Sequence, residues 1–333
     1  MLNRRRALAL AGLPALAALP CPARAAWPER PVRIVVPYAA GGNIDVVSRL
    51  LAPALSERLG QPGETGRFAV VVDNRPGAGG SLGAEQVARA APDGYTLLAG
   101  SNGPLTVNPL VQARLPYEPL RDFLPIALVN AVPLALMVTS GAATALGDAI
   151  ARSRAQPGSF TTGTPGVGST AHLALELFNA ATGAGLTHVP YRGGGAVVPD
   201  LIAGTIRATF IEFSTALPIH KEGRGRILAI ASRARSPQAP DVPTFIESGV
   251  PDFLAASYCG LLAPRATPVP VANAFRTALI AATEDPAIRA RLEGMGSEMA
   301  SAAERTTEGF AAFLQRQAND ARRAADLAGL KPE

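Results

Sequence analysis

Short apolar runs alternate with amphipathic stretches along most of the chain. The apolar runs are VRIVVP (32–37), FAVVVD (68–73), YTLLAG (95–100), LALMVT (134–139), ATFIEF (208–213) and RILAIAS (226–232). Continuous apolar runs of this length are typical of strands that are covered on both faces. Their alternation with helical patterns therefore predicts an α/β fold with mainly parallel sheets.

The stretches between the runs have helical periodicity. In the first of them the apolar positions recur at spacings of three, one and four, which places them on one helix face. These positions are Ile44, Val47, Leu50, Leu51, Ala54 and Leu55. The C-terminal region, residues 268 to 328, is predicted to contain helices only, with a break at Asp285-Pro286.

Glycine-rich loops follow the predicted strands at their carboxyl ends. They are YAAGGNID, NRPGAGGSLGAE, SNGPLTVNP with Ser101 and Asn102, GTPGVGSTAH and YRGGGAVVPD. Ligands of open α/β sheets bind at this edge of the sheet. The loops are therefore predicted to converge on one cleft.

Two of these loops lead directly into a helix. The loop Tyr38–Asn43 precedes a helix whose first N–H groups have no partner within the helix, and Asp45 in the first turn can cap them. The stretch 161–178 has the same design, with Ser169 and Thr170 at the predicted N-cap. Two such helix starts can hold one carboxylate from two sides. The alternative is an ordinary pair of βα loops with glycines for close packing.

The N-terminus has the features of a secretory signal peptide. Arg4, Arg5 and Arg6 precede the apolar segment ALALAGLPALAAL, and Ala23-Arg24-Ala25 fits a cleavage site. We predict export with cleavage after Ala25, by either the general or the twin-arginine route. The segment carries four arginines and no acid, so its removal reduces the formal net charge from +5 to +1. No basic run indicates nucleic-acid binding, and Cys259 remains as the only cysteine, which excludes an intramolecular disulfide.

Other chemistries have weaker support. Gly79-Gly80-Ser81-Leu82-Gly83 fits the G-x-S-x-G pattern of a nucleophilic serine, and a secreted serine hydrolase using Ser81 is the alternative function. The same loop fails as a dinucleotide fingerprint because Leu82 stands where the third glycine is needed.

The remaining polar candidates suggest neither a metal nor a cofactor. The spacing of the three histidines, His172, His188 and His220, is not that of metal ligands, so no bound metal is predicted. The turn at Tyr191-Arg192-Gly193 can offer a guanidinium to a carboxylate, although an exposed loop arginine is the commoner outcome.

Together these stretches resemble one family, the exported substrate-binding proteins of tripartite tricarboxylate transporters, known as the Bug or TctC-like family. The resemblance covers nearly all of the chain after residue 25. It is carried by WPERPVRIVVPYAAGGNIDVVSRLLAPALSERLGQP, VVVDNRPGAGGSLGAEQVARAAPDGYTLLAG, LPYEPLRDFLPIALV, GSTAHLALELF, HVPYRGGGAVVPDLIAG and LLAPRATP.

The resemblance implies a two-domain periplasmic binding protein fold of type II, each domain a mainly parallel sheet flanked by helices, with the ligand cleft between them. We expect domain 1 at residues 26–125 and 250–333, and domain 2 at 126–249. The family implies a small carboxylate ligand (a di- or tricarboxylate, an amino acid or an aromatic acid), no catalysis, and membrane transporter subunits or a sensor as partners. We also expect the protein to be a monomer. The residues expected at the cleft are Tyr38, Ala39, Ala40, Gly41, Gly42, Asp45, Ser101, Asn102, Thr164, Gly168, Ser169, Thr170, His172, Tyr191 and Glu212.

The stretch ATFIEFSTALP departs from the family pattern. A short polar pair, commonly Asp-Asn, follows the phenylalanine in relatives, whereas Ile211 and Glu212 stand here. If Glu212 faces the cleft, it repels a second anionic group on the ligand and favours a cationic group such as an ammonium. If it points into solvent, it has no such effect.

Overall fold

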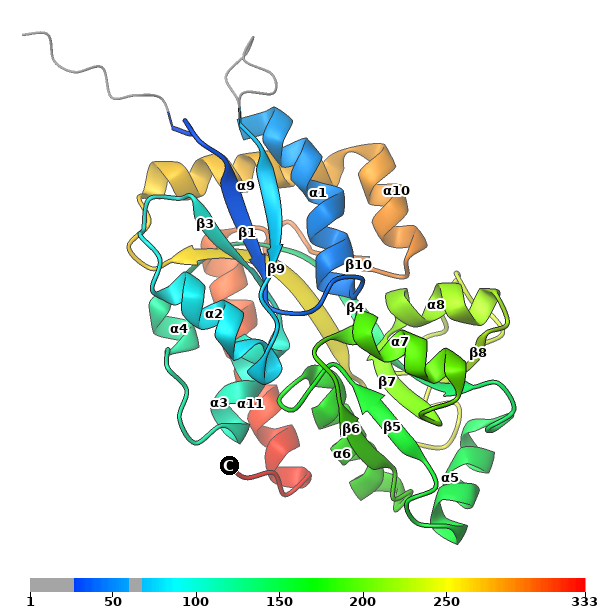
Figure 1. Cartoon of the computed structure of the whole chain (residues 1–333). Coiled ribbons are helices and arrows are strands. Elements are labelled where there is room, and N and C mark those ends of the chain that lie inside the picture. Colours follow the sequence, from blue (N-terminus) through cyan, green and yellow to red (C-terminus); the bar gives the residue numbers. More distant parts are fainter. Residues whose placement is uncertain (1–26, 60–67, 333) are drawn as a thin grey trace, which may run out of the picture.

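The computed structural model describes residues 27–59 and 68–332 (Figure 1). The predicted signal peptide lies outside the described residues. The strands are β1 (Val32–Val36), β2 (Val70–Asn74), β3 (Thr96–Gly100), β4 (Phe123–Thr139), β5 (Thr161–Thr164), β6 (Thr187–Pro190), β7 (Ala208–Glu212), β8 (Gly225–Ile230), β9 (Ala256–Pro264) and β10 (Glu298–Met299). The α-helices are α1 (Asn43–Leu59), α2 (Ser81–Ala88), α3 (Asn108–Val111), α4 (Pro119–Asp122), α5 (Leu146–Ala155), α6 (Thr170–Thr182), α7 (Gly194–Ala203), α8 (Phe213–Lys221), α9 (Val269–Glu284), α10 (Pro286–Gly294) and α11 (Thr307–Leu327). A short 3-10 turn, η1 (Ala78–Gly80), and a π-helical turn, η2 (Gly103–Val107), precede α2 and α3.

The strands form one mixed sheet that runs through two lobes. Its order is β2-β1-β3-β9-β4-β7-β5-β6, and β8 and β10 also pair with β4. We call residues 27–59, 68–132 and 256–332 the first lobe and residues 133–255 the second lobe, because β4 pairs with β9 up to Pro133 and with β7 and β8 from Leu134 onward. Figure 1 shows the lobes side by side, joined by β4 and β9.

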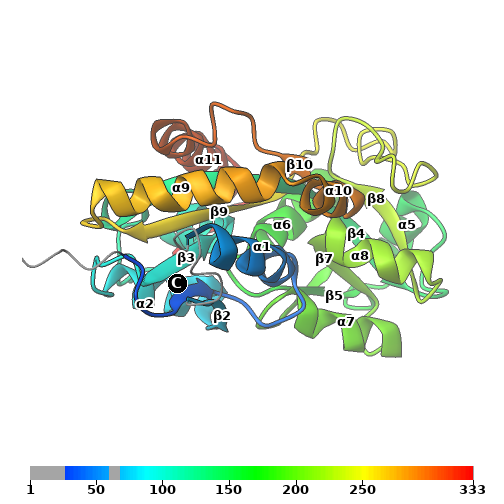
Figure 2. The ribbon, with the colours of Figure 1, turned by 90° about the horizontal axis from the view of Figure 1, so that it is seen from above.

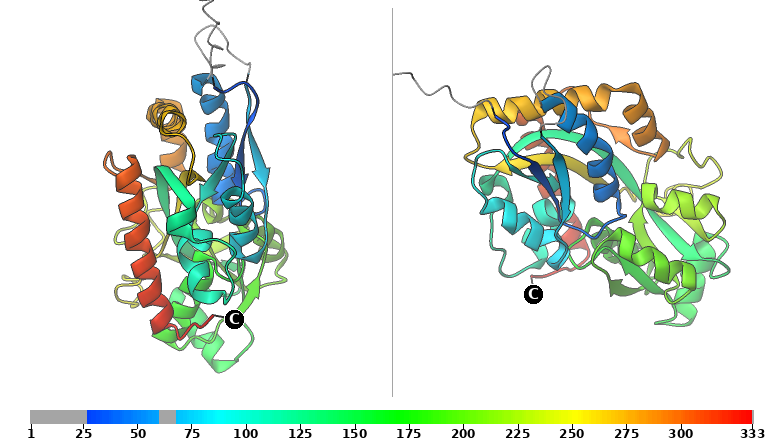
Figure 3. Two further views of the ribbon diagram at one scale, coloured as in Figure 1. Left: turned by 90° about the vertical axis from the view of Figure 1, so that its left-hand side faces the viewer. Right: turned by 45° about the horizontal axis from the view of Figure 1, so that its top comes forward.

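Each lobe has helices on both faces of its sheet. In the first lobe α1 and α9 cover one face, and α2 and α11 cover the other. In the second lobe α5 and α6 lie on one face, and α7 and α8 on the other. The view from above shows the strands between these helices (Figure 2), and Figure 3 shows α11 running along one side of the molecule.

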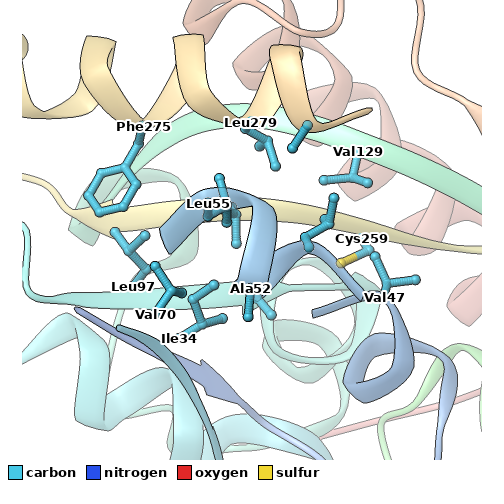
Figure 4. Close-up of a cluster of buried hydrophobic side chains, with 14 of the residues drawn as sticks. Ile34, Val47, Ala52, Leu55, Val70, Leu97, Val129, Cys259, Phe275 and Leu279 are labelled. Carbon is cyan, nitrogen blue, oxygen red and sulfur yellow. The ribbon is translucent and has the colours of Figure 1, made fainter. Parts of the chain in front are cut away.

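The core of the first lobe explains why α1 has one apolar stripe. Val47 and Leu55 on that stripe are fully buried and pack between the sheet residue Ile34 and Phe275 and Leu279 of α9 (Figure 4). Burying a leucine or phenylalanine side chain contributes about 1.5–3 kcal/mol. This packing fixes the direction of α1 and therefore the position of its first turn.

The α/β fold predicted from the sequence is confirmed, and each of the six predicted apolar runs overlaps a strand. The sheet is mixed because β4 and β9 run antiparallel to their neighbours, whereas β1 with β2 and β3, and β5 with β6 and β7, are parallel. The prediction of helices only beyond residue 268 was wrong at Glu298–Met299, which pairs with β4 through backbone groups. Within the described ranges, no helix combines the length and the apolar character that crossing a membrane requires.

Candidate functional site

The loop between β1 and α1 is held in shape by Asp45. The Asp45 carboxylate accepts a hydrogen bond from Gly41 N–H at 2.9 Å, from Asn74 Nδ2 at 2.8 Å and from Arg49 Nε at 3.0 Å. Gly41 has φ +85°, a conformation that glycine adopts without strain. Asp45 therefore holds the loop through the N–H of Gly41, which precedes α1, and its charge is compensated by Arg49.

These contacts make Asp45 responsive to acid. Burial alone would raise its pKa, but the hydrogen bonds from Arg49, Gly41 and Asn74 outweigh burial and hold the pKa below the ordinary value of 3.8. A depressed folded-state pKa adds stability that is fully present above the unfolded pKa and is lost as the pH falls through the folded value.

We therefore expect Asp45→Ala to lower the free energy of unfolding at pH 7 by about 1–3 kcal/mol, because buried donors lose their acceptor. The deficit relative to the unmodified protein should shrink as the pH falls below 3.8. Urea denaturation at several pH values measures both effects. Asp320→Ala, at an exposed position, is the control and should leave stability unchanged; a constant deficit across this pH range would contradict the role of the Asp45 charge.

The loop between β5 and α6 is supported from behind by two histidines. Ser169 caps α6 by accepting a hydrogen bond from His172 N–H at 3.2 Å, and Gly168 N–H donates to His172 Nδ1 at 3.3 Å. His188 stacks on His172 with ring centroids 4.2 Å apart and bonds to Thr164 Oγ1 through Nε2 at 2.7 Å. Burial and then the neighbouring His172 lower the pKa of His188 to about 4, so this ring is neutral at pH 7.

The two loops and two further segments line one small cavity between the lobes. Its walls are formed by Tyr38, Gly42, Asn43, Ile44, Asp45, Pro165, Ser169, Thr170, Gly194, Glu212 and Ser257. The first turns of α1, α6 and α7, and the N-cap of α8 at Glu212, all meet there. The cavity has a volume of about 20 Å³, which is room for about one water molecule.

Asn43 supplies an unused donor at this cavity. Its side chain is buried, and its Oδ1 accepts a hydrogen bond from Ser214 Oγ of the second lobe at 2.9 Å. Its Nδ2 has no hydrogen-bond partner among the described residues. A buried donor without a partner costs about 1–3 kcal/mol, and an anionic oxygen in the cavity would remove that cost.

Backbone groups bring the lobes into contact around the cavity. Ala39 N–H donates to the Arg192 carbonyl at 2.9 Å, and a Cβ added to Gly195 would lie 2.1 Å from the Ala40 carbonyl oxygen. Figure 1 shows the loop before α1 next to the start of α7. The lobes are therefore in direct contact through main-chain atoms beside the cavity.

Two larger grooves flank the cavity. The front groove, about 470 Å³, shares Tyr38 and Pro165 with the cavity. The rear groove, about 870 Å³, shares Thr170 with it and extends between α6 and α11. Neither groove has the converging helix starts of the small cavity, so the cavity is the candidate binding site.

The structure places six of the predicted site residues on the cavity wall: Tyr38, Gly42, Asp45, Ser169, Thr170 and Glu212. Gly168 is not on the wall; its N–H donates to His172 Nδ1 in the loop before α6. Ala39, Ala40 and Gly41 lie at the lobe contact, and Thr164 and His172 lie behind the second loop.

Three predicted residues hold other parts of the structure. Ser101 donates to the Tyr38 hydroxyl at 3.3 Å, and Asn102 fixes the start of β9 through Ala256 and Tyr258. Tyr191 lines the front groove and donates its hydroxyl to Asp200 at 2.6 Å.

The sequence analysis missed five cavity residues: Asn43, Ile44, Pro165, Gly194 and Ser257. Asn43 and Gly194 are the first residues of α1 and α7, and both stand in glycine-rich loops that had been singled out. Ser257 lies in β9, a strand that was not predicted, and the apolar run SYCGLLAP was the available signal.

The hydroxyl group of Ser81 is used in hydrogen bonds to neighbouring side chains. It is buried, donates to Gln112 Oε1 at 2.8 Å and accepts from Asn108 Nδ2 at 2.8 Å. Across residues 27–59 and 68–332, no histidine is a hydrogen-bond partner of Ser81, whereas a serine nucleophile requires a base within hydrogen-bond reach. The geometry gives no support to the hydrolase alternative.

Comparison with known proteins finds matches that extend over most of the chain. Residues 47–325 match the family described as the tripartite tricarboxylate transporter family receptor. The periplasmic binding protein BugD is 31% identical, with a TM-score of 0.87 over 92% of this chain and 100% of BugD. Rpa4515 of R. palustris with adipate is 32% identical (TM-score 0.86; 92% of this chain, 100% of that chain). MatC from Rhodopseudomonas palustris with bound malate is 30% identical (TM-score 0.84; 91% and 100%).

Proposed function

This chain belongs to the tripartite tricarboxylate transporter receptor family, and we propose that it captures a small carboxylate-bearing ligand in the cavity between its lobes and delivers it to a membrane transporter of that type. Family membership makes it a solute-binding protein and implies a periplasmic location. The proposal further includes export by the cleaved segment 1–25, binding without catalysis, and a sensor as the other candidate membrane partner.

One observation carries the proposal: the unpartnered Nδ2 of Asn43 lies where the first turns of α1 and α6 meet. The N–H groups of a helix start and the positive end of its dipole favour an anionic oxygen. In the proposed complex the ligand carboxylate accepts hydrogen bonds from these turns, from Asn43 and from the Thr170 hydroxyl. The related structures with adipate and with malate support a carboxylate as the anchored group of the ligand.

We also propose that the two lobes are the two domains predicted from the sequence and that they separate to admit the ligand. The predicted boundaries were 125/126 and 249/250. Strand pairing supports boundaries slightly later in the sequence, one within β4 near Pro133 and the other between Ala255 and Ala256. Ligand contacts made by both lobes would then favour the closed arrangement.

The substitution Asn43→Asp tests the proposed role of the Asn43 Nδ2 donor without changing the size of the side chain. The aspartate keeps the shape of the side chain and the acceptor for Ser214, but replaces the unpartnered donor by an anionic oxygen. We expect carboxylate affinity to fall by about 10- to 100-fold, as charged hydrogen bonds contribute about 1.5–3 kcal/mol.

The assay is thermal unfolding of residues 26–333, refolded to remove retained ligand, against a panel of small carboxylic acids. A ligand present at 100 times its Kd adds about 2.7 kcal/mol, which raises the Tm by several degrees. Asn319→Asp makes the same change at an exposed position on α11 and should keep the full shift. A panel without any shift, or equal shifts in Asn43→Asp and the unmodified protein, would contradict the proposal.

A further inference from the structure

Glu212 is the second carboxylate at the cavity, and it differs from Asp45 in having no cationic partner. It ends β7 at the N-cap of α8, and only 9% of its surface is exposed. Its Oε2 lies 3.4 Å from the position that a Cβ on Gly194 would take, which places it beside the first turn of α7. In the described ranges its side-chain partner is Ser257, and no lysine, arginine or histidine forms an ion pair with it.

The surroundings of Glu212 act on its charge in opposite directions. Burial raises the pKa of Glu212 above its ordinary value, because the ionised carboxylate loses water, and the hydrogen bonds from its own backbone N–H and from Ser257 offset only part of that rise. The starts of α7 and α8 also favour the ionised form. A cationic group in the cavity would compensate the charge of Glu212, as Arg49 compensates the charge of Asp45. A second ligand carboxylate beside Glu212 would instead be repelled.

We propose that the ligand is an α-amino acid or a close analogue, and that Glu212, with Ser257, receives its cationic nitrogen while Asn43 and the first turns of α1 and α6 hold its carboxylate. This rests on the proposed function and specifies the ligand class for the same cavity. Asn43, Thr170 and Glu212 line the same small cavity, so the carboxylate and the cationic nitrogen of one short ligand would lie near each other.

Matched pairs of acids, each with and without the α-ammonium group, test this inference by calorimetric titration. The pairs are L-glutamate with glutarate, L-alanine with propionate, and L-phenylalanine with 3-phenylpropionate. In at least one pair we expect the amino acid to bind about 10- to 100-fold more tightly, as for a charge-assisted hydrogen bond. Glu212→Gln keeps the side-chain shape and should abolish that preference.

Glu222→Gln is the matched control, because it changes an exposed glutamate just beyond the other end of α8. It should keep the preference for the amino acid. The ratio within each pair in the unmodified protein is a readout that does not depend on the folding of any variant.

The outcomes separate the two proposals. If acids bind but the ammonium group adds no affinity, or if Glu212→Gln leaves the preference intact, the amino-acid inference is overturned and the carboxylate-binding function stands. If no acid of either kind binds the refolded protein, the binding function itself fails, and the inference fails with it.

Discussion

Replacing Gly195 by alanine should lower ligand affinity by more than about 100-fold while leaving the ligand-free protein folded. A Cβ at this position would lie 2.1 Å from the carbonyl oxygen of Ala40 and 3.0 Å from the carbonyl carbon of Gly41, which belong to the other lobe. Contacts this short cannot be relieved by a side-chain rotation, because both partners are backbone atoms. The lobes would have to stay apart, and the ligand would lose the contacts of one lobe.

The second lobe itself should tolerate Gly195→Ala. Gly195 lies within α7, its φ is not in the left-handed region, and alanine favours a helix by about 1 kcal/mol over glycine. Calorimetric titration measures the affinity, and small-angle X-ray scattering with ligand should give a larger radius of gyration than for the unmodified protein. Gly147→Ala in α5 is the control, since nothing lies within 4 Å of its added Cβ. Unchanged affinity in Gly195→Ala would show that binding does not require the lobe contact.

Phe210→Ala should destabilise the second lobe by about 3–5 kcal/mol, because it removes a large side chain from a closely packed core. Phe210 is fully buried in β7 and contacts the rings of Phe178, Phe245 and Phe253, with centroids 5.7–6.3 Å apart. The aromatic cluster belongs entirely to residues 133–255, so the loss falls on that lobe.

The only tryptophan of the chain makes it possible to measure the unfolding of one lobe separately. Trp27 packs against Phe275 and Tyr95 in the first lobe, so its fluorescence reports the unfolding of that lobe. In Phe210→Ala we expect circular dichroism to show an early urea transition that Trp27 does not follow. Phe275→Ala, at the equivalent depth in the first lobe, should instead shift the tryptophan transition. Coincident transitions in both variants would show one cooperative unit and contradict the proposed division into two domains.

Local signals in the sequence predicted the strands and the helix starts well. The runs at β1, β3, β7 and β8 are continuous because helices cover them on both faces, and glycines mark the loops that follow. The run at β2 is equally apolar, although β2 is an edge strand and Val71 is exposed. Only the second half of β4 was predicted. Its first half contains Pro125, Asn130 and Pro133, and its pairing shifts register in two places, so the apolar pattern is interrupted there.

The chemistry of the cavity depends on contacts that no local pattern contains. The compensation of Asp45 by Arg49 follows from helical spacing, but the position of Glu212 beside Gly194 and Ser257 requires β7, α7 and β9 to be in place. The unused donor of Asn43 becomes visible only when Ser214 of the other lobe takes its Oδ1. Sequence therefore identified the loops and missed which of their atoms are left unsatisfied.

The contact between the lobes is made by main-chain atoms: the bond from Ala39 N–H to the Arg192 carbonyl, and the close approach of Gly195 to Ala40. Main-chain atoms are unaffected by most substitutions, whereas Glu212 and Ser257 reach the cavity through side chains. Under the proposed function, substitution of these two side chains would change which ligand is recognised, while the main-chain contact between the lobes would stay the same. Position 212 would then be the first to change in redesigning this protein as a biosensor for another small molecule.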